Sequence, residues 1–148
     1  MTTTFNHIAV LCDDVVECFK HTPQRRYIDG TVGGAGHACA VMEMSPAQTE
    51  LLCIDLDPDA LTAAKQRLTP YGARVVFRHG NFSQMSEFAA ERGWEWVDGI
   101  LLDLGVSSHQ LDTAHRGFSF QHDADLDMRL DPTRSEEHTS ELQSRQYL

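Results

Sequence analysis

The sequence is short of positive charge and of long apolar runs. Twelve lysines and arginines face 22 aspartates and glutamates, which gives a formal net charge of -10. This balance is the wrong sign for a protein that holds RNA by phosphate neutralisation alone, although it leaves the partner open. No run of about 18 apolar residues occurs, and residues 1–6 have neither the basic nor the apolar part of a signal peptide. We therefore expect a soluble, cytoplasmic protein that does not enter a membrane.

Cysteine and histidine lack the spacing of a metal site. The four cysteines never form a CxxC pair, and the eight histidines contain no HExxH pattern. These are the arrangements in which zinc ligands usually occur. We therefore predict neither a metal centre nor a disulfide, and we expect the cysteines to be small buried apolar groups.

Apolar segments typical of strands alternate along the chain with apolar segments typical of helices. The chain has 41% hydrophobic residues and is long enough to bury a core. This alternation predicts strands and crossover helices around one parallel sheet, an α/β fold. The expected strands cover residues 26–29, 51–55, 74–78 and 97–104. The expected helices cover residues 10–21, residues 36–44, a segment from Pro58 through Leu68 with Asp57 as its cap, and a segment that Ser83 caps and that ends at Gly93. The fourth strand is nearly all apolar, as in strands buried on both faces, and residues 105–133 have the character of a long functional loop.

A glycine-rich turn follows the first expected strand, in the string YIDGTVGGAGH. Glycines such as Gly33 and Gly36 permit positive φ and let a ligand approach the backbone closely. Dinucleotide dehydrogenases share such a turn, so the glycines alone do not identify the ligand. Asp29 narrows the choice, because a carboxylate at the mouth of the turn would repel a pyrophosphate and attract the ammonium group beside a sulfonium. This favours S-adenosylmethionine over NAD.

Two further positions follow expected strands at the same edge of the sheet. Asp55 ends the second strand, where its side chain can accept hydrogen bonds from ribose hydroxyls of either cofactor. Its alternative role is to support the next helix, for which Asp57 is better placed. Phe82 follows the third strand, and the sequence leaves open whether it stacks on adenine or seats the following helix.

Asp103 ends the fourth expected strand, in DLGVSSHQ. A carboxylate there can accept a hydrogen bond from an amine and balance the positive charge that develops as the nitrogen is alkylated. The alternative is an acid that only terminates the strand. We favour catalysis, because an acid after three consecutive apolar residues has no evident structural task.

The strings YIDGTVGGAGH, IDLDPDAL, HGNFS, DGILLDLGVSS, RGFSF and LDMRLDPTR occur in this order. Together they resemble the bacterial RsmH (MraW) family, which methylates N4 of a cytidine in small-subunit ribosomal RNA. The resemblance spans roughly residues 7–134. It implies S-adenosylmethionine as cofactor, and small-subunit ribosomal RNA or the assembled subunit as partner. It also implies that residues 1–133 form the N-terminal part of a Rossmann-like methyltransferase domain, with a sheet truncated after its fourth strand.

The resemblance also implies which residues contact the cofactor. Ala35 occupies a position at which members of this family often have glycine. His37 would offer its imidazole or its backbone N–H to the methionine carboxylate, with a helix N-cap role as the alternative. With the residues argued above, the predicted cofactor site comprises Asp29, Gly33, Ala35, Gly36, His37, Asp55, Phe82, Asp103 and Gln110, and the predicted catalytic residue is Asp103.

The last residues differ from everything before them. RSEEHTSELQS resembles the in-frame translation of a sequencing-adapter oligonucleotide, so we predict that residues 134–148 are not native. A short charged helix is the alternative. A sheet that stops at its fourth strand would expose an apolar edge, and we expect such a chain to bind cofactor weakly and to lack enzyme activity alone. A nicotinamide dehydrogenase and a non-catalytic nucleotide-binding module remain the competing functions.

Overall fold

The computed structural model describes residues 11–20, 26–106, 110–111, 113–119, 123–124 and 127–133. The adapter-like segment, residues 134–148, lies outside the described residues. The chain divides into two compact units, Met1–Gly105 and Val106–Leu148.

The first unit is built on a four-stranded parallel sheet. Its strands are β1 (Arg26–Asp29), β2 (Glu50–Asp55), β3 (Val75–His79) and β4 (Gly99–Leu101). They lie in the order β3-β2-β1-β4, so β1 pairs with β2 on one side and with β4 on the other. The chain order therefore reverses at β1, and the predicted parallel α/β fold is confirmed.

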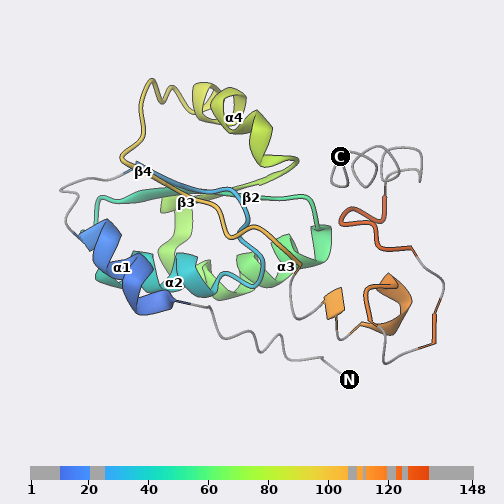
Figure 1. The fold of residues 1–148 in the computed structure, drawn as a ribbon. Helices are drawn as coiled ribbons and strands as arrows, with labels where there is room; N and C mark the ends of the chain where they lie inside the picture. The colour runs from blue at the N-terminus through green and yellow to red at the C-terminus, as the bar shows by residue number, and fades with distance from the viewer. Residues whose placement is uncertain are drawn as a thin grey trace, which may run out of the picture. The chain divides into compact units, whose positions relative to one another are not determined.

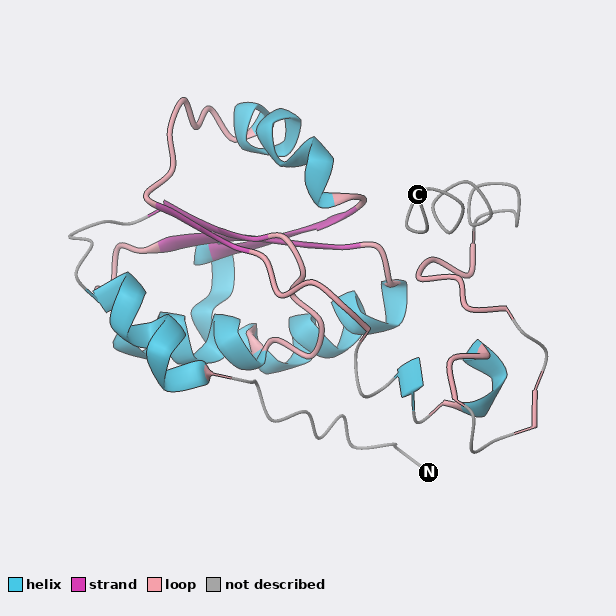
Figure 2. Ribbon diagram, in the orientation of Figure 1, coloured by secondary structure: helices cyan, strands magenta, loops and turns pink. Residues whose placement is uncertain are grey.

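Helices cover both faces of this sheet, as Figure 1 and Figure 2 show. The helices α1 (Cys12–Lys20), α2 (Gly36–Met44) and α3 (Pro58–Arg67) lie on one face, and α4 (Met85–Glu91) lies on the other. Three short 3-10 helices complete the described elements: η1 (Thr69–Arg74), η2 (Phe82–Gln84) and η3 (Ala114–Arg116). Among the described residues, every helix is too short or too polar to cross a bilayer.

The core has two halves because strand side chains alternate between the faces of the sheet. Tyr27 and Leu51 belong to the cluster beneath α1, α2 and α3, whereas Ile28 and Leu52 belong to the cluster beneath α4. Asp29 follows Tyr27 by two positions, so its side chain emerges on the face that α2 covers. The pattern that builds the core thus also directs an acid toward the glycine turn.

Two predicted helix starts have different outcomes. Asp57 is the N-cap of α3, and its carboxylate accepts a hydrogen bond from the Asp59 N–H at 2.9 Å, as predicted. Ser83 is not a cap, so that prediction is wrong. Asn81 caps η2 in its place, because its side chain accepts from the Ser83 N–H while the Gln84 side chain accepts from the Asn81 N–H. The helix that follows ends at Glu91, short of Gly93.

The fourth strand corrects the sequence prediction most clearly. It covers three residues instead of eight, and Ile100, Leu102 and Leu104 are 47%, 39% and 67% exposed. The prediction of a strand buried on both faces is therefore wrong. The physical reason is its place at the edge of the described sheet, where β4 has β1 as its one neighbour. The exposed apolar edge that we expected is confirmed.

The second unit contains the segment predicted as a long loop. Its described part includes η3 and a buried arginine, Arg116, which is 3% exposed. The Arg116 guanidinium donates to the carbonyl oxygens of Arg129 and Leu130 at 3.1 and 2.9 Å. These bonds tie η3 to the segment around Arg129.

Candidate functional site

The candidate site lies at the carboxyl edge of the sheet, where the strand order reverses. Ligands of open α/β folds bind outside the carboxyl ends of the strands at such a reversal. Asp29 ends β1, Asp55 ends β2, and Asp103 follows β4 by two residues. The structure therefore brings three of the predicted residues to one edge.

The glycine turn between β1 and α2 is fixed to β2. The Val32 N–H donates to the Ile54 carbonyl oxygen at 3.1 Å, and the Gly33 N–H donates to Asp55 Oδ2 at 2.8 Å. Gly33 has a φ of 49°, in the left-handed region that favours glycine. Ala35 also has positive φ, at 61°, and serves as the N-cap of α2. An alanine thus occupies a conformation in which glycine would be less strained.

Arg67 holds the same turn from outside. Its guanidinium Nη1, at the end of α3, donates to the Gly34 carbonyl oxygen at 2.6 Å. The sequence analysis did not identify this residue. The one signal in the sequence was that Arg67 is a basic residue in the last turn of a helix. Nothing in the residue spacing connects this position with the glycine turn.

Asp55 has two backbone partners and remains half-buried. Its Oδ2 accepts from the Gly33 N–H, and its Oδ1 accepts from the Asp57 N–H at 2.9 Å. Burial raises the pKa of Asp55, and these backbone donors oppose the rise. Asp57 fills the helix-capping role. The carboxylate of Asp55 joins the glycine turn to the end of β2, and its oxygens have further lone pairs.

Asp29 is the most buried of the three acids, at 3% exposure. It borders a small void of about 10 Å³ together with apolar side chains that include Ala38, Val41 and Leu101. Burial raises the pKa of Asp29 to about 7, and the negative charges of Asp55 and Asp103 add to the rise. A hydrogen bond from the Thr31 N–H at 3.2 Å opposes it.

Asp103 is anchored by its backbone and leaves its carboxylate accessible. Its N–H donates to Thr31 Oγ1 at 2.7 Å, and its side chain is 49% exposed. His37 Nδ1 lies 3.8 Å from Asp103 Oδ2. Since Ala35 is the N-cap of α2, the alternative of His37 as a cap is wrong. Thr31 was missed in the sequence analysis, although its place inside the glycine turn was the available signal.

Phe82 and Gly30 meet at the same edge. A Cβ added to Gly30 would lie 3.0 Å from Phe82 Cβ and 2.6 Å from Leu102 Cδ2. Glycine is therefore required here for close packing, a role that the sequence analysis did not assign. Phe88, not Phe82, packs against the apolar cluster beneath α4. Phe82, the first residue of η2, is partly buried with its Cβ next to Gly30, and its contact with adenine stays a prediction.

Two other predictions concern Gln110 and metal. Gln110 is 5% exposed and belongs to the second unit, so its contact with a cofactor stays a prediction. Within the described ranges, no group of three or more His, Cys, Asp and Glu side chains has the arrangement of a metal site. The four cysteines are free thiols, but Cys53 alone is buried; Cys12 and Cys39 are partly exposed and Cys18 is exposed, so the expectation of buried cysteines is wrong for these three.

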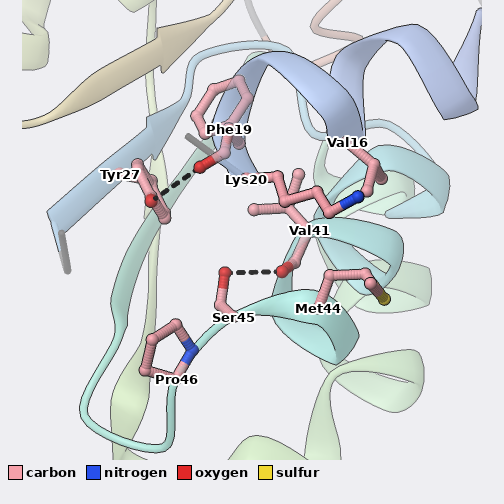
Figure 3. Close-up of a pocket in the computed structure, with 8 residues that line it drawn as sticks. All are labelled: Val16, Phe19, Lys20, Tyr27, Val41, Met44, Ser45 and Pro46. Carbon is pink, nitrogen blue, oxygen red and sulfur yellow. Dashed lines mark hydrogen bonds between the residues drawn. The ribbon is translucent and has the colours of Figure 1, made fainter. Parts of the chain in front are cut away.

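A separate hollow of about 190 Å³ lies between α1 and α2 (Figure 3). It is lined mainly by apolar side chains, including Phe19, Val41 and Pro46. Two polar groups at its wall are turned to the backbone: the Tyr27 hydroxyl donates to the Phe19 carbonyl oxygen, and the Ser45 hydroxyl donates to the Val41 carbonyl oxygen. Because Ser45 follows the last turn of α2, this hollow lies at the opposite end of that helix from the glycine turn. It contains none of the predicted site residues.

The electrostatic character of the candidate site follows from its acids. In the part of the chain that the structure describes, His37 is the one basic side chain recorded within 4.0 Å of the three carboxylates. Their mutual repulsion in a partly buried setting favours a ligand of net positive charge and disfavours an anionic diphosphate.

Comparison with known proteins identifies relatives along most of the chain. It is 52% identical over 127 residues to "Ribosomal RNA small subunit methyltransferase H" of Geotalea daltonii, covering 86% of this chain and 41% of that protein. It is 47% identical over 139 residues to the protein of the same name from Nitratidesulfovibrio vulgaris, covering 94% of this chain and 38% of that protein. The chain thus spans about two fifths of the length of these relatives.

Solved structures share the fold at low sequence identity. The O-methyltransferase TomG from Streptomyces achromogenes, solved in complex with SAM, matches with a TM-score of 0.57 at 15% identity, over 69% of this chain and 47% of its own. NSun6 from Pyrococcus horikoshii matches with a TM-score of 0.51 at 13% identity, over 92% of this chain and 31% of its own. The model of the MraW methylase family matches residues 4–146. The chain therefore belongs to the MraW methylase family.

Proposed function

We propose that this chain provides the cofactor half of an enzyme that methylates N4 of a cytidine in small-subunit (16S) ribosomal RNA with S-adenosylmethionine. The observation that carries the proposal is the convergence of Asp29, Asp55 and Asp103 around a glycine turn. Family membership and the names of the relatives support methyl transfer to small-subunit ribosomal RNA, while the N4 position of a cytidine rests on the resemblance of the motifs. Such a substrate agrees with the cytoplasmic location that the sequence predicts.

The residues present fit this cofactor better than a dinucleotide. S-adenosylmethionine carries one net positive charge, which the three acids would stabilise. The ribose hydroxyls suit Asp55, whose oxygens already accept two backbone N–H groups and can accept more. The methionine carboxylate suits the N-terminus of α2 at Gly36 and His37, and the adenine suits the ring of Phe82. A diphosphate on the same turn would face uncompensated carboxylates.

Asp103 is the residue that we assign to the reaction. When bound, the cofactor would supply a methyl group on a sulfonium, and the N4 lone pair would form the new C–N bond as the C–S bond breaks and leaves a thioether. Asp103 accepts a hydrogen bond from the N4 amine and balances the charge that develops on nitrogen. The proton then leaves the alkylated nitrogen through this half-exposed carboxylate to water. The bond from the Asp103 N–H to Thr31 Oγ1 holds the carboxylate beside the turn.

The proposal can be tested in a chimera in which residues 1–133 replace the matching segment of the Geotalea daltonii relative. We expect it to transfer a labelled methyl group to small-subunit RNA, with N4-methylcytidine as the product in nucleoside mass spectrometry. Asp103→Asn should lower kcat by a factor of about 10² to 10⁴. Glu95→Gln, an exposed acid in the loop before β4, is the matched control. Methylation at another atom, or full activity of the Asp103→Asn chimera, would contradict the proposal.

A further inference from the structure

The three acids of the site are not equivalent. Asp29 is 3% exposed, Asp55 is partly buried with two backbone donors, and the Asp103 side chain is 49% exposed. One hydrogen bond to Asp29 is recorded, from the Thr31 N–H. Since desolvation penalises a carboxylate that has few donors, Asp29 is the acid that ionises at the greatest cost.

The groups that face Asp29 come from every element around it. The glycine turn contributes the Thr31 N–H, and the ends of β2 and β4 contribute the charges of Asp55 and Asp103. Burial raises the pKa of the Cys53 thiol of β2 well above its usual value, and the charge of Asp29 adds to the rise. From α2, His37 lies against Asp103, with its Nδ1 3.8 Å from Asp103 Oδ2. None of the described ion pairs places a cation on Asp29 itself, so its charge is opposed from two sides.

We propose that Asp29 holds a proton in the free site and releases it to solvent when the positively charged cofactor binds. The inference rests on the proposed function, because it names a property of the same site. In the coupled equilibrium, neutral Asp29 carboxylic acid and the cofactor give a carboxylate beside the bound cation plus one solvent proton. Charge is thereby conserved, and the buried carboxylate gains a counter-ion, which none of the described side chains is recorded to provide.

The coupling between cofactor binding and proton release has a defined direction and size. The pKa of Asp29 is about 7 in the free chain, so acid favours the neutral form and opposes binding of a cation. If the bound form stays ionised throughout, affinity rises about eightfold between about pH 6 and about pH 7.5 and then levels off. About half a proton is released per bound cofactor near pH 7, and close to one near pH 6.

Isothermal titration calorimetry of this chain with S-adenosylmethionine measures the release directly. Titrations in phosphate and in Tris at the same pH differ in buffer ionisation heat, and their difference gives the number of protons released. The same titrations are made on Asp29→Asn. The cofactor's own amino group titrates at about 7.7–8.0, but it does so equally with both proteins. The difference between wild type and Asp29→Asn therefore isolates Asp29.

We expect proton release and the eightfold rise in the wild type and in the Glu95→Gln control, and neither in Asp29→Asn. S-adenosylhomocysteine lacks the sulfonium charge, so it should release fewer protons. Binding without proton release, or the same pH dependence in Asp29→Asn, overturns this inference and leaves the proposed function intact. Absence of all binding overturns both.

A measurement on the free chain gives a second check. The side-chain carboxyl carbon of Asp29, followed by NMR against pH and assigned by its loss in Asp29→Asn, should titrate near pH 7. Titration near the ordinary aspartate value of about 4 would overturn the inference whatever the cofactor affinity.

Discussion

Gly30→Ala tests whether the site is assembled by close packing between the strand ends. Gly30 directly follows Asp29, and its N–H donates to the Leu101 carbonyl oxygen at 2.9 Å. An added Cβ would lie 2.6 Å from Leu102 Cδ2 and 3.0 Å from Phe82 Cβ. Carbon atoms in van der Waals contact are normally about 3.5–4.0 Å apart, so both neighbours must move.

The two contacts differ in how easily they yield. Leu102 meets the added atom with the end of a side chain that is 39% exposed, so a rotamer change costing about 0.5–1.5 kcal/mol relieves it. Phe82 meets it with Cβ, next to a backbone that the Asn81 capping box fixes. That contact requires a backbone shift. We expect a total loss of about 2 kcal/mol, within the range of about 1–3 kcal/mol for overpacked sites.

Urea unfolding followed by circular dichroism measures this loss in the single variants and in the Gly30→Ala, Leu102→Ala double variant. Removing the Leu102 side chain should recover part of the loss, with a coupling of at least about 0.5 kcal/mol. The Phe82 part should remain. A Gly30→Ala chain as stable as the wild type, or a double variant that shows simple additivity, would refute the packing argument.

Three further results are expected. Thr31→Val removes the acceptor for the Asp103 N–H at 2.7 Å and should cost about 1 kcal/mol in urea unfolding and weaken cofactor binding, whereas Thr31→Ser should retain both. Arg67→Met removes the donor to the Gly34 carbonyl oxygen and should lower the unfolding free energy by about 1 kcal/mol; the neighbouring exposed Gln66→Met should not. The raised pKa of Asp29 means that the folded state holds the proton more tightly than the unfolded state, so its contribution to stability is fully present below about pH 4 and is lost as pH rises to about 7. The unfolding free energy of the wild type, relative to Asp29→Asn, should therefore fall across that window, and a flat difference would contradict the assigned burial.

Much of the fold was predictable because local signals agreed with the tertiary structure. The strand Arg26–Asp29 and the helix Gly36–Met44 have the bounds expected from the sequence. Asp57 and Pro58 marked the start of α3 correctly, since capping and N1 proline are local effects. The predicted burial of the strand around Ile100 was wrong, because the hydrophobicity of a strand is the same whether or not a neighbouring strand covers it. The exposure of the strand depends on what lies beside it.

The acidic residues of the site were predictable from the sequence, whereas the residues that hold the site in place were not. Asp29, Asp55 and Asp103 stand at strand ends, so the parallel topology alone brings them to one edge. Thr31 and Arg67 act through hydrogen bonds to partners 72 and 33 residues away in the chain, which no local pattern indicates. The same holds for the pKa of Asp29, because burial and neighbouring charge exist only once the chain has folded.

The central claim is that the strand-end carboxylates form a site for a cationic nucleoside. Comparing the binding of two cofactors tests this claim most directly. Calorimetric titration of this chain with S-adenosylmethionine and with NADH should show binding of the first and none of the second. Asp55→Ala should weaken the binding of S-adenosylmethionine by at least about tenfold, as expected for lost hydrogen bonds to a charged group. The control Asp59→Ala, at an exposed position, should leave this affinity unchanged. Binding of NADH at comparable affinity, or unchanged S-adenosylmethionine affinity in Asp55→Ala, would contradict the account.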